Sequence, residues 1–272
     1  MEKVMQIADA AFAYSRQLVW QGICLDVYKG ELLCILGPNG CGKTTLLSCM
    51  HGARPLKKGR IALNREPLEN MGAAEIARKI GVVFQEHTTP FPYAVLDVVL
   101  MGRGPHLGLF QSPSAKDRQI ALKNLDHMGI ADLKDKRYTE ISGGERQLVL
   151  IARTLTQEPE VILLDEPTSH LDFKNQALVL GMIKRLTVQG LTVVMTSHFP
   201  NHALICADRV AMMNNNGLVG VGETQKMMTE ANLEKTYDIG VRMITVHDQK
   251  EDEAIRFCMP SMEKRRTYGT KP

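Results

Sequence analysis

The chain contains 272 residues, of which 44% are hydrophobic and 23% are charged, close to the mixture of an ordinary soluble globular protein. This composition excludes a disordered or collagen-like chain, and the formal net charge of +3 gives no support to nucleic acid as a partner. The first residues lack the order of a secretory signal, and the six cysteines form no CxxC pair. We therefore expect a cytoplasmic protein with reduced thiols.

The N-terminal part of the chain predicts two paired strands, followed by a buried strand, a turn and a helix. Residues 7–14 and 18–27 have the pattern of two paired strands. Residues 32–36 are a short continuous apolar run, typical of a strand that is buried on both faces. A glycine-rich turn and a helix follow this run.

Residues 90–158 differ in character from the rest of the chain. Helical periodicity recurs at 95–101, 115–128 and 145–156, and glycines are frequent at 102–108. We interpret this stretch as a helical subdomain that is inserted into a sheet domain.

The last part of the chain returns to alternating strands and helices. Strands are expected at 161–164 and 192–196 and near 210–213 and 217–221, with a helix at 174–188. Because strands that alternate with helices form a largely parallel, covered sheet, the expected class is α/β.

These elements define three parts of the chain. Residues 1–89 and 159–249 form the expected α/β core, and residues 90–158 form the helical subdomain. Residues 250–272 switch to mixed charge, so we expect a poorly ordered tail.

The turn after residues 32–36 carries the strongest motif. It reads GPNGCGKTT and matches G-x-x-x-x-G-K-[ST], with a strand before it and a helix after it. Backbone N–H groups of such a loop surround phosphates, the lysine reaches the β and γ phosphates, and the hydroxyl after it ligates Mg²⁺. The motif predicts a nucleoside triphosphate held by Gly37, Pro38, Asn39, Gly40, Cys41, Gly42, Lys43, Thr44 and Thr45, with Thr44 on the metal.

A second motif is VILLDEP, an apolar strand that ends in Asp165 and Glu166. Adjacent carboxylates at the carboxyl edge of a parallel sheet meet the ligand crevice. We expect Asp165 to hold Mg²⁺ and Glu166 to polarise the water that attacks the γ-phosphate.

A third motif is ISGGERQ at residues 141–147, where Ser142 and two glycines precede a helix. A helix start without bulky side chains can receive an anion, but a plain serine N-cap with a glycine entry explains the pattern equally well. In the first interpretation, two chains arranged head to tail would complete each other's nucleotide site.

Together these motifs resemble those of ATP-binding cassette (ABC) transporter ATPase subunits, over about residues 3–245. The resemblance implies a P-loop sheet core with N-terminal antiparallel strands, ATP and Mg²⁺ as ligands, ATP hydrolysis, and a head-to-tail homodimer that sandwiches the nucleotide. It places Ser142, Gly143, Gly144 and Glu145 against the partner's nucleotide. Position 145 is Glu where the family usually has Gln.

The resemblance also gives roles to residues that the motifs alone do not assign. Gln85 would sense Mg²⁺ and the attacking water, Tyr14 would stack on adenine, and His198 would contact the γ-phosphate. The segment 169–172, which ends in Asp172, would cross the dimer interface. Taken alone, Gln85 also fits a polar strand end, Tyr14 a core position shared with Phe12, and His198 with His202 a weak zinc pair.

The expected partners and cargo follow from the same resemblance. With no run of roughly 18 to 20 apolar residues to cross a bilayer, the ATPase would dock peripherally at the cytoplasmic face of the inner membrane. Its partners there would be separate multi-span permease subunits, which would contact residues 85–108, and indirectly a substrate-binding protein.

Residues 91–110 and 197–203 resemble importers of metal chelates, namely iron siderophores, haem and cobalamin. Alternatives are an importer of molybdate-type oxyanions, a non-transport ABC ATPase acting on ribosomes or DNA, and a P-loop kinase or GTPase.

Overall fold

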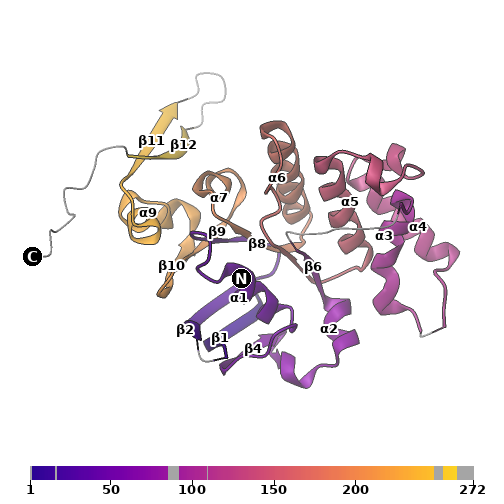
Figure 1. Ribbon diagram of the computed structural model, residues 1–272, viewed down its shortest axis with the longest axis horizontal. Helices are drawn as coiled ribbons and strands as arrows, with labels where there is room; N and C mark the ends of the chain where they lie inside the picture. Colours follow the sequence, from indigo (N-terminus) through magenta and orange to yellow (C-terminus); the bar gives the residue numbers. More distant parts are fainter. Residues whose placement is uncertain (1, 16, 85–91, 109, 248–253, 262–272) are drawn as a thin grey trace, which may run out of the picture.

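The computed structural model describes residues 2–15, 17–84, 92–108, 110–247 and 254–261 (Figure 1). The centre of the fold is a six-stranded sheet in the order β10-β9-β3-β8-β7-β6. Five of its strands are parallel and β10 is antiparallel to β9. The strands are β3 (Leu32–Leu36), β6 (Ile80–Val83), β7 (Val161–Leu164), β8 (Thr192–Ser197), β9 (Arg209–Asn214) and β10 (Gly217–Glu223).

A second, antiparallel sheet covers one side of the core. Its order is β2-β1-β4-β5, with β1 (Lys3–Tyr14), β2 (Gln17–Tyr28), β4 (Lys58–Leu63) and β5 (Glu66–Pro67). Helix α1 (Lys43–Met50) lies between the two sheets, and seven of its eight residues are buried. The helix can be buried on all sides because its side chains are mostly apolar or small.

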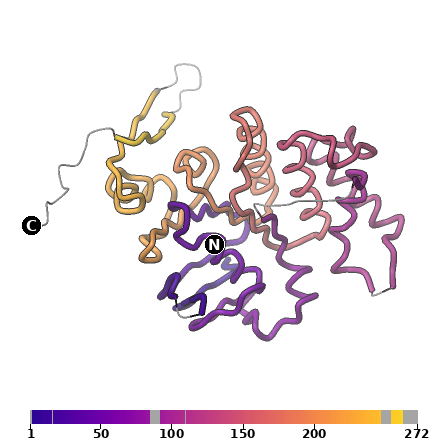
Figure 2. The backbone as a smooth tube through the Cα atoms, in the orientation of Figure 1, coloured from indigo at the N-terminus to yellow at the C-terminus, as the bar shows by residue number. Residues whose placement is uncertain are grey.

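The other face of the parallel sheet is covered by the larger hydrophobic cluster, which extends into a group of helices. The chain leaves the sheet after β6, builds this group and returns at β7, as Figure 2 shows. The α-helices outside α1 are α2 (Ala73–Lys79), α3 (Val95–Leu100), α4 (Ala115–His127), α5 (Gly143–Thr156), α6 (Phe173–Val188), α7 (Pro200–Cys206), α8 (Thr224–Met227) and α9 (Glu230–Tyr237). Short 3-10 turns lie at η1 (Leu68–Asn70), η2 (Met101–His106), η3 (Ala131–Leu133) and η4 (Tyr138–Glu140).

The α/β class expected from the sequence is confirmed, and the all-apolar runs at β3 and β7 are fully buried, as parallel strands should be.

The C-terminal region differs from the expected poorly ordered tail. Residues Ala254–Pro260 form strand β12, which pairs with β11 (Val241–His247) in an antiparallel hairpin. The hairpin is anchored to α7, because the backbone N–H of Cys258 donates to Asn201 Oδ1 at 2.8 Å. The structure differs from the expectation here because strand β12 depends on pairing with β11 and on Asn201, which no local pattern at 250–272 records. The remainder of 250–272 lies outside the described residues, except Ser261.

Candidate nucleotide-binding site

The phosphate-loop motif lies between β3 and α1, and its glycines are required by its shape. Gly40 and Gly42 have φ angles of 83° and 96°, which side chains other than glycine rarely adopt. A Cβ atom at Gly37 would lie 2.2 Å from the carbonyl oxygen of Met213. Gly42 caps α1 without a side-chain hydrogen bond, so the first N–H groups of the helix are left for a ligand.

The ammonium group of Lys43 is buried against this loop. Its Nζ donates to the carbonyl oxygens of Gly37 and Pro38 at 2.9 and 3.0 Å. It also lies 3.4 Å from Oε1 of Glu166. The loop carbonyls and one carboxylate therefore satisfy a charge that would be costly to bury alone.

The two acidic residues after β7 are held by hydrogen bonds to neighbouring backbone and to one hydroxyl. The backbone N–H of Asp165 donates to the carbonyl oxygen of Val83 at 2.8 Å. Thr196 Oγ1 donates to Asp165 Oδ1 at 2.7 Å and accepts from the backbone N–H of Glu166 at 2.8 Å. Asp165 is only 2% exposed, and Glu166 has a φ of 44°.

His198, which follows β8, contacts the same carboxylate that Lys43 contacts. Its Nδ1 lies 2.9 Å from Oε2 of Glu166. The Tyr237 hydroxyl of α9 donates to the backbone carbonyl of His198 at 3.0 Å. The ring centroid of Phe199, the residue after His198, lies 4.0 Å from the ring centroid of His198. His198 is thus held by the neighbouring Phe199 ring and by Tyr237 of α9.

A cleft of about 440 Å³ opens above the phosphate loop and is lined by the ends of β1 and β2, by the loop with the start of α1, and by Glu166. Tyr14 lines this cleft and is 46% exposed, whereas Phe12 is 6% exposed and packs into the core. The Tyr14 hydroxyl lies 3.3 Å from Thr45 Oγ1, and the Arg54 guanidinium lies 5.0 Å from the Tyr14 ring centroid. Of the two aromatic side chains, Tyr14 is therefore the one placed where a base could stack.

The ISGGE segment forms the start of α5, with Ser142 as the N-cap. The Glu145 backbone N–H donates to Ser142 Oγ at 3.3 Å, and the Ser142 backbone N–H donates to Glu145 Oε2 at 2.7 Å. This capping box lowers the pKa of Glu145, through the Ser142 side chain first and its backbone second. A Cβ atom at Gly144 would lie 2.4 Å from Asn175 Oδ1, so this helix start packs closely on α6.

The structure brings some of the expected site residues together and leaves others apart. Among the described residues that line the cleft, none comes from 142–145 or is Asp172. Asp172 caps α6, where its Oδ1 accepts from the backbone N–H of Asn175 at 2.8 Å. Gln85 lies outside the described residues.

A magnesium ion fits the donors at the loop, whereas the zinc alternative does not fit the histidines. Mg²⁺ is usually held by one or two protein oxygens together with phosphates, which matches the Thr44 hydroxyl and the Asp165 carboxylate. His202 Nδ1 already lies 3.1 Å from Ser197 Oγ and 3.3 Å from Thr168 Oγ1. Within the described ranges, no three His, Cys, Asp or Glu side chains are grouped to hold a metal.

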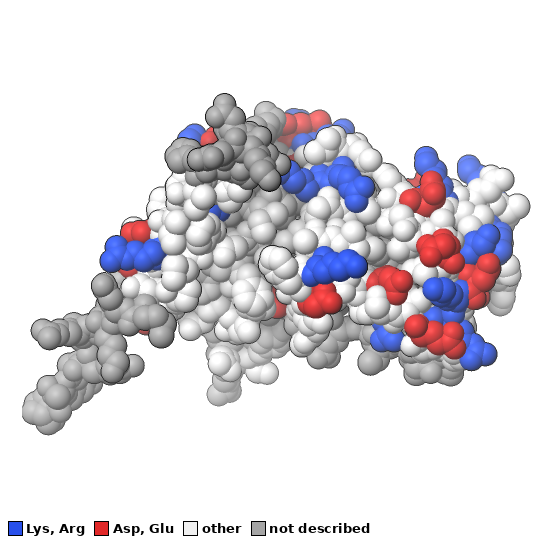
Figure 3. Space-filling view, turned by 90° about the horizontal axis from the view of Figure 1, so that it is seen from above, with Lys and Arg blue, Asp and Glu red and all other residues white. Residues whose placement is uncertain are grey.

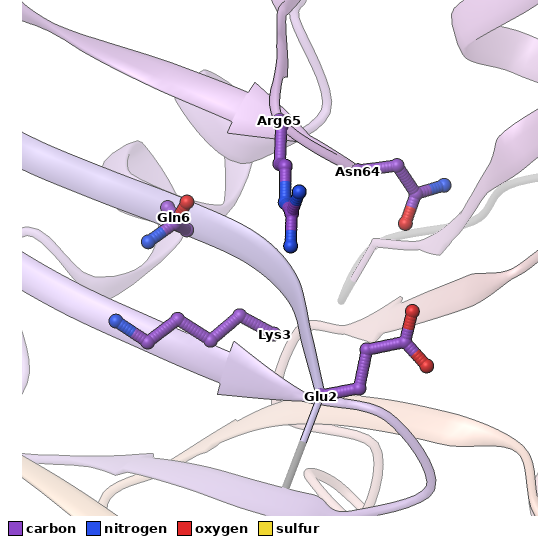
Figure 4. A pocket seen from close by; sticks show the side chains of 5 residues that line it. All are labelled: Glu2, Lys3, Gln6, Asn64 and Arg65. Carbon is purple, nitrogen blue, oxygen red and sulfur yellow. The ribbon is translucent and has the colours of Figure 1, made fainter.

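A separate hollow of about 450 Å³ lies at the end of the antiparallel sheet where β1 begins and β4 turns into β5 (Figure 4). It is lined by Glu2, Lys3, Gln6, Asn64 and Arg65, and Lys3 is paired with Asp26 at 2.9 Å. It shares no residue with the cleft above the loop.

Two residues that contact the site were missed by sequence reasoning, Thr196 and Tyr237. Thr196 has a weak signal, because it is one of two polar residues that follow the apolar run at 193–195 at the end of β8. Tyr237 has no sequence signal, since the residue that it contacts, His198, lies 39 positions away in the chain.

Comparison with known proteins decides the family. The sequence profile of the family described as ABC transporter matches residues 20–169. The chain belongs to this family. Over 236 residues, this ABC ATPase is 39% identical to the molybdate import ATP-binding protein MolC of Haemophilus influenzae, covering 86% of this chain and 87% of MolC.

Two further relatives cover more of the chain. A protein of Helicobacter pylori named as a probable iron chelatin transport ATP-binding protein is 37% identical over 249 residues, 91% of this chain and 97% of the relative. A solved structure of an ABC transporter assigned to the metal-chelate type, in an inward-facing conformation, superposes with a TM-score of 0.85 at 35% identity. The match covers 96% of this chain and 98% of that chain.

Family membership establishes the general activity. ABC ATPases bind and hydrolyse ATP, and those of transporters work with membrane permease components. In the described part of this ABC ATPase, no helix is both long and apolar enough to cross a membrane.

Proposed function

We propose that this ABC ATPase drives the import of a metal chelate, of the iron-siderophore, haem or cobalamin class, through separate permease subunits. The catalytic part of the proposal is carried by one observation, that the Glu166 carboxylate lies between Lys43 and His198. The transport part is supported by the names of the iron chelatin relative and of the metal-chelate type structure.

The geometry suits in-line transfer of the γ-phosphoryl group to water. Lys43 would exchange its loop carbonyls for the β and γ phosphate oxygens, and the α1 N–H groups would bind the same phosphates. The Glu166 carboxylate would then accept a hydrogen bond from the attacking water, and His198 would hold the γ-phosphate on the other side. Bound Mg²⁺, for which Thr44, Asp165 and Gln85 are the expected ligands, would supply positive charge to the β and γ oxygens.

A second copy of the chain would complete each site. Ser142, Gly143 and Gly144 do not line the cleft of their own chain, yet they form a helix start that can receive an anion. In a head-to-tail homodimer this helix start, with Glu145 capping it and Asp172 at the contact between chains, would close over the partner's γ-phosphate. ATP binding would then close the dimer, and hydrolysis would reopen it.

The helical subdomain at 90–158 offers the surface for the permease. Exposed large apolar side chains lie within the expected docking segment 85–108, at Tyr93 and Met101, and next to it, at Phe84 and Phe110. Such side chains suit contact with another protein. Docking there would place the ABC ATPase peripherally at the cytoplasmic face of the inner membrane.

Two alternatives to a metal-chelate importer are a molybdate-type importer and an ATPase that acts on ribosomes or DNA. The identity to MolC supports a molybdate-type oxyanion as the second candidate cargo. On the face shown in Figure 3, Lys and Arg are interspersed with Asp and Glu over the helical end of the molecule. A ribosome- or DNA-acting ATPase would be better served by a continuous basic surface.

The test is purification of the tagged chain from detergent-solubilised membranes, followed by reconstitution of the complex in lipid vesicles. We expect a multi-span permease to copurify, and ATP hydrolysis to rise with a binding protein loaded with ferric siderophore, haem or cobalamin. Stimulation by molybdate alone would replace the cargo assignment. Retention only on ribosomes or DNA would contradict transport.

A further inference from the structure

We propose that Thr196 is a positioning residue that sets the two carboxylates of the site at once. The inference rests on the proposed roles of Asp165 and Glu166. Thr196 lies on β8, directly beside β7 in the sheet, and Met195 pairs with Leu164 in the register. The side chain of Thr196 therefore stands next to the two residues that follow β7.

The hydroxyl of Thr196 is fully committed to these two residues. Its proton goes to Asp165 Oδ1 at 2.7 Å, and its oxygen accepts the backbone N–H of Glu166 at 2.8 Å. The residue is 0% exposed, so no bulk water competes for either hydrogen bond. A buried hydroxyl that both donates and accepts has a fixed orientation, and it fixes the groups it joins.

The bond to Glu166 supports an unusual backbone. Glu166 has a φ of 44°, in the left-handed region that residues with a side chain avoid. Such a conformation persists only where the surroundings hold it. It also turns the Glu166 side chain toward Lys43 and His198, where both carboxylate oxygens are engaged.

The bond to Asp165 selects which oxygen faces a metal. Oδ1 is the atom that Thr196 holds, so Oδ2 is the oxygen left to face a metal. Hydrogen bonds of this kind orient a ligating carboxylate, and their removal typically costs about 10- to 100-fold in affinity or activity. Thr196 would therefore act on both the metal ligand and the water-orienting carboxylate.

The experiment compares Thr196→Val, which keeps the shape and removes the hydroxyl, with Thr196→Ser, which keeps the hydroxyl. Thr192→Val is the matched control, because Thr192 is a buried threonine of the same strand whose hydroxyl accepts from the Gly30 N–H at 3.0 Å, away from the carboxylates. Each variant is measured for kcat and KM with MgATP, for thermal unfolding, and for Mn²⁺ binding with ATP by electron paramagnetic resonance.

We expect Thr196→Val to lower kcat by about 10- to 100-fold and to weaken Mn²⁺ binding, with a smaller change in KM. Thr196→Ser should restore both, and Thr192→Val should change only the unfolding temperature. Wild-type kcat and Mn²⁺ binding in Thr196→Val would overturn the inference, as would a Ser variant as impaired as the Val variant. Full turnover in Glu166→Gln would instead overturn the proposed role of Glu166.

Discussion

Nδ1 of His198 lies 2.9 Å from one oxygen of Glu166, whose other oxygen lies 3.4 Å from Lys43 Nζ. The three side chains follow three strands that are neighbours in the sheet, in the order β3-β8-β7. Because these strands are parallel, their carboxyl ends meet at one edge and bring distant residues into contact. The site therefore exists only where the carboxyl ends of these three strands lie side by side.

Replacing the Glu166 carboxylate should separate hydrolysis from binding. We expect Glu166→Gln to lower turnover by about 10² to 10⁴, because the amide cannot accept the water's proton, while ATP binding is retained. Steady-state phosphate release and equilibrium binding of labelled ATP measure the two effects. Glu69→Gln, at an exposed glutamate, is the control. Unchanged turnover in Glu166→Gln would remove this residue from the catalytic assignment.

The Tyr237 hydroxyl should influence catalysis through His198. His198→Ala removes the imidazole and should lower kcat by about 10² or more. Tyr237→Phe removes only the hydrogen bond to the His198 carbonyl and should lower kcat by roughly 2- to 10-fold, with KM for ATP nearly unchanged. In the double variant the Tyr237 change should have no further effect. Tyr28→Phe, whose ring packs on Arg209, serves as the control. Equal losses from Tyr237→Phe in the wild-type and His198→Ala backgrounds would show that Tyr237 does not act through His198.

Two inactive variants should restore activity when mixed, if each site takes residues from both chains. Lys43→Ala removes the phosphate-binding lysine, and Ser142→Asp keeps an N-cap while placing a negative charge toward the partner's phosphate. A mixed dimer then has one fully wild-type site and one doubly defective site. Random exchange of subunits should give roughly a quarter of wild-type turnover. No recovery in a mixture shown to form mixed dimers would contradict shared sites, as would a fully active Ser142→Asp.

Acid should weaken the start of α5 through Glu145. The Ser142 side chain and backbone lower the pKa of Glu145 from its ordinary value of 4.5. A carboxyl group with a lowered pKa in the folded state adds stability above its unfolded pKa, and this stability is lost as the pH falls through the folded pKa. The unfolding temperature of wild type should therefore drop more steeply than that of Glu145→Gln as the pH falls below 4.5. Identical pH profiles would show that the capping box has no electrostatic contribution.

The single tryptophan should report nucleotide binding. Trp20 is 1% exposed, and a Cβ atom on Gly42 would lie 2.7 Å from its ring, so it packs directly under the phosphate loop. Its buried Nε1 has no hydrogen-bond partner in the described part of the chain, which makes its emission sensitive to small movements there. ATP should produce a saturable change in Trp20 fluorescence, shifted to higher ATP concentration by Lys43→Ala. A fluorescence change with the same ATP dependence in wild type and in Lys43→Ala would contradict this prediction.

Local sequence patterns predicted the strands and helices whose formation depends mainly on their own residues. The continuous apolar runs at β3 and β7 predicted buried strands, and helical periodicity predicted α4 and α6 within a residue or two. The hairpin strand β12 was missed, because its stability comes from pairing with β11 and from Asn201, both of which lie elsewhere in the chain.

The sequence alone determined the phosphate loop, the carboxylate pair after β7 and the helix start at Ser142, because each is a short run whose residue types and spacing dictate its own backbone. Only the tertiary structure decided that His198 and Lys43 meet at Glu166, and that Thr196 holds the Asp165 carboxylate and the Glu166 backbone N–H. It also decided that Tyr14 rather than Phe12 faces the cleft, and that residues 142–145 do not line the cleft. These relationships join residues about 30 or more positions apart, and they depend on strand order and packing, which no local pattern records.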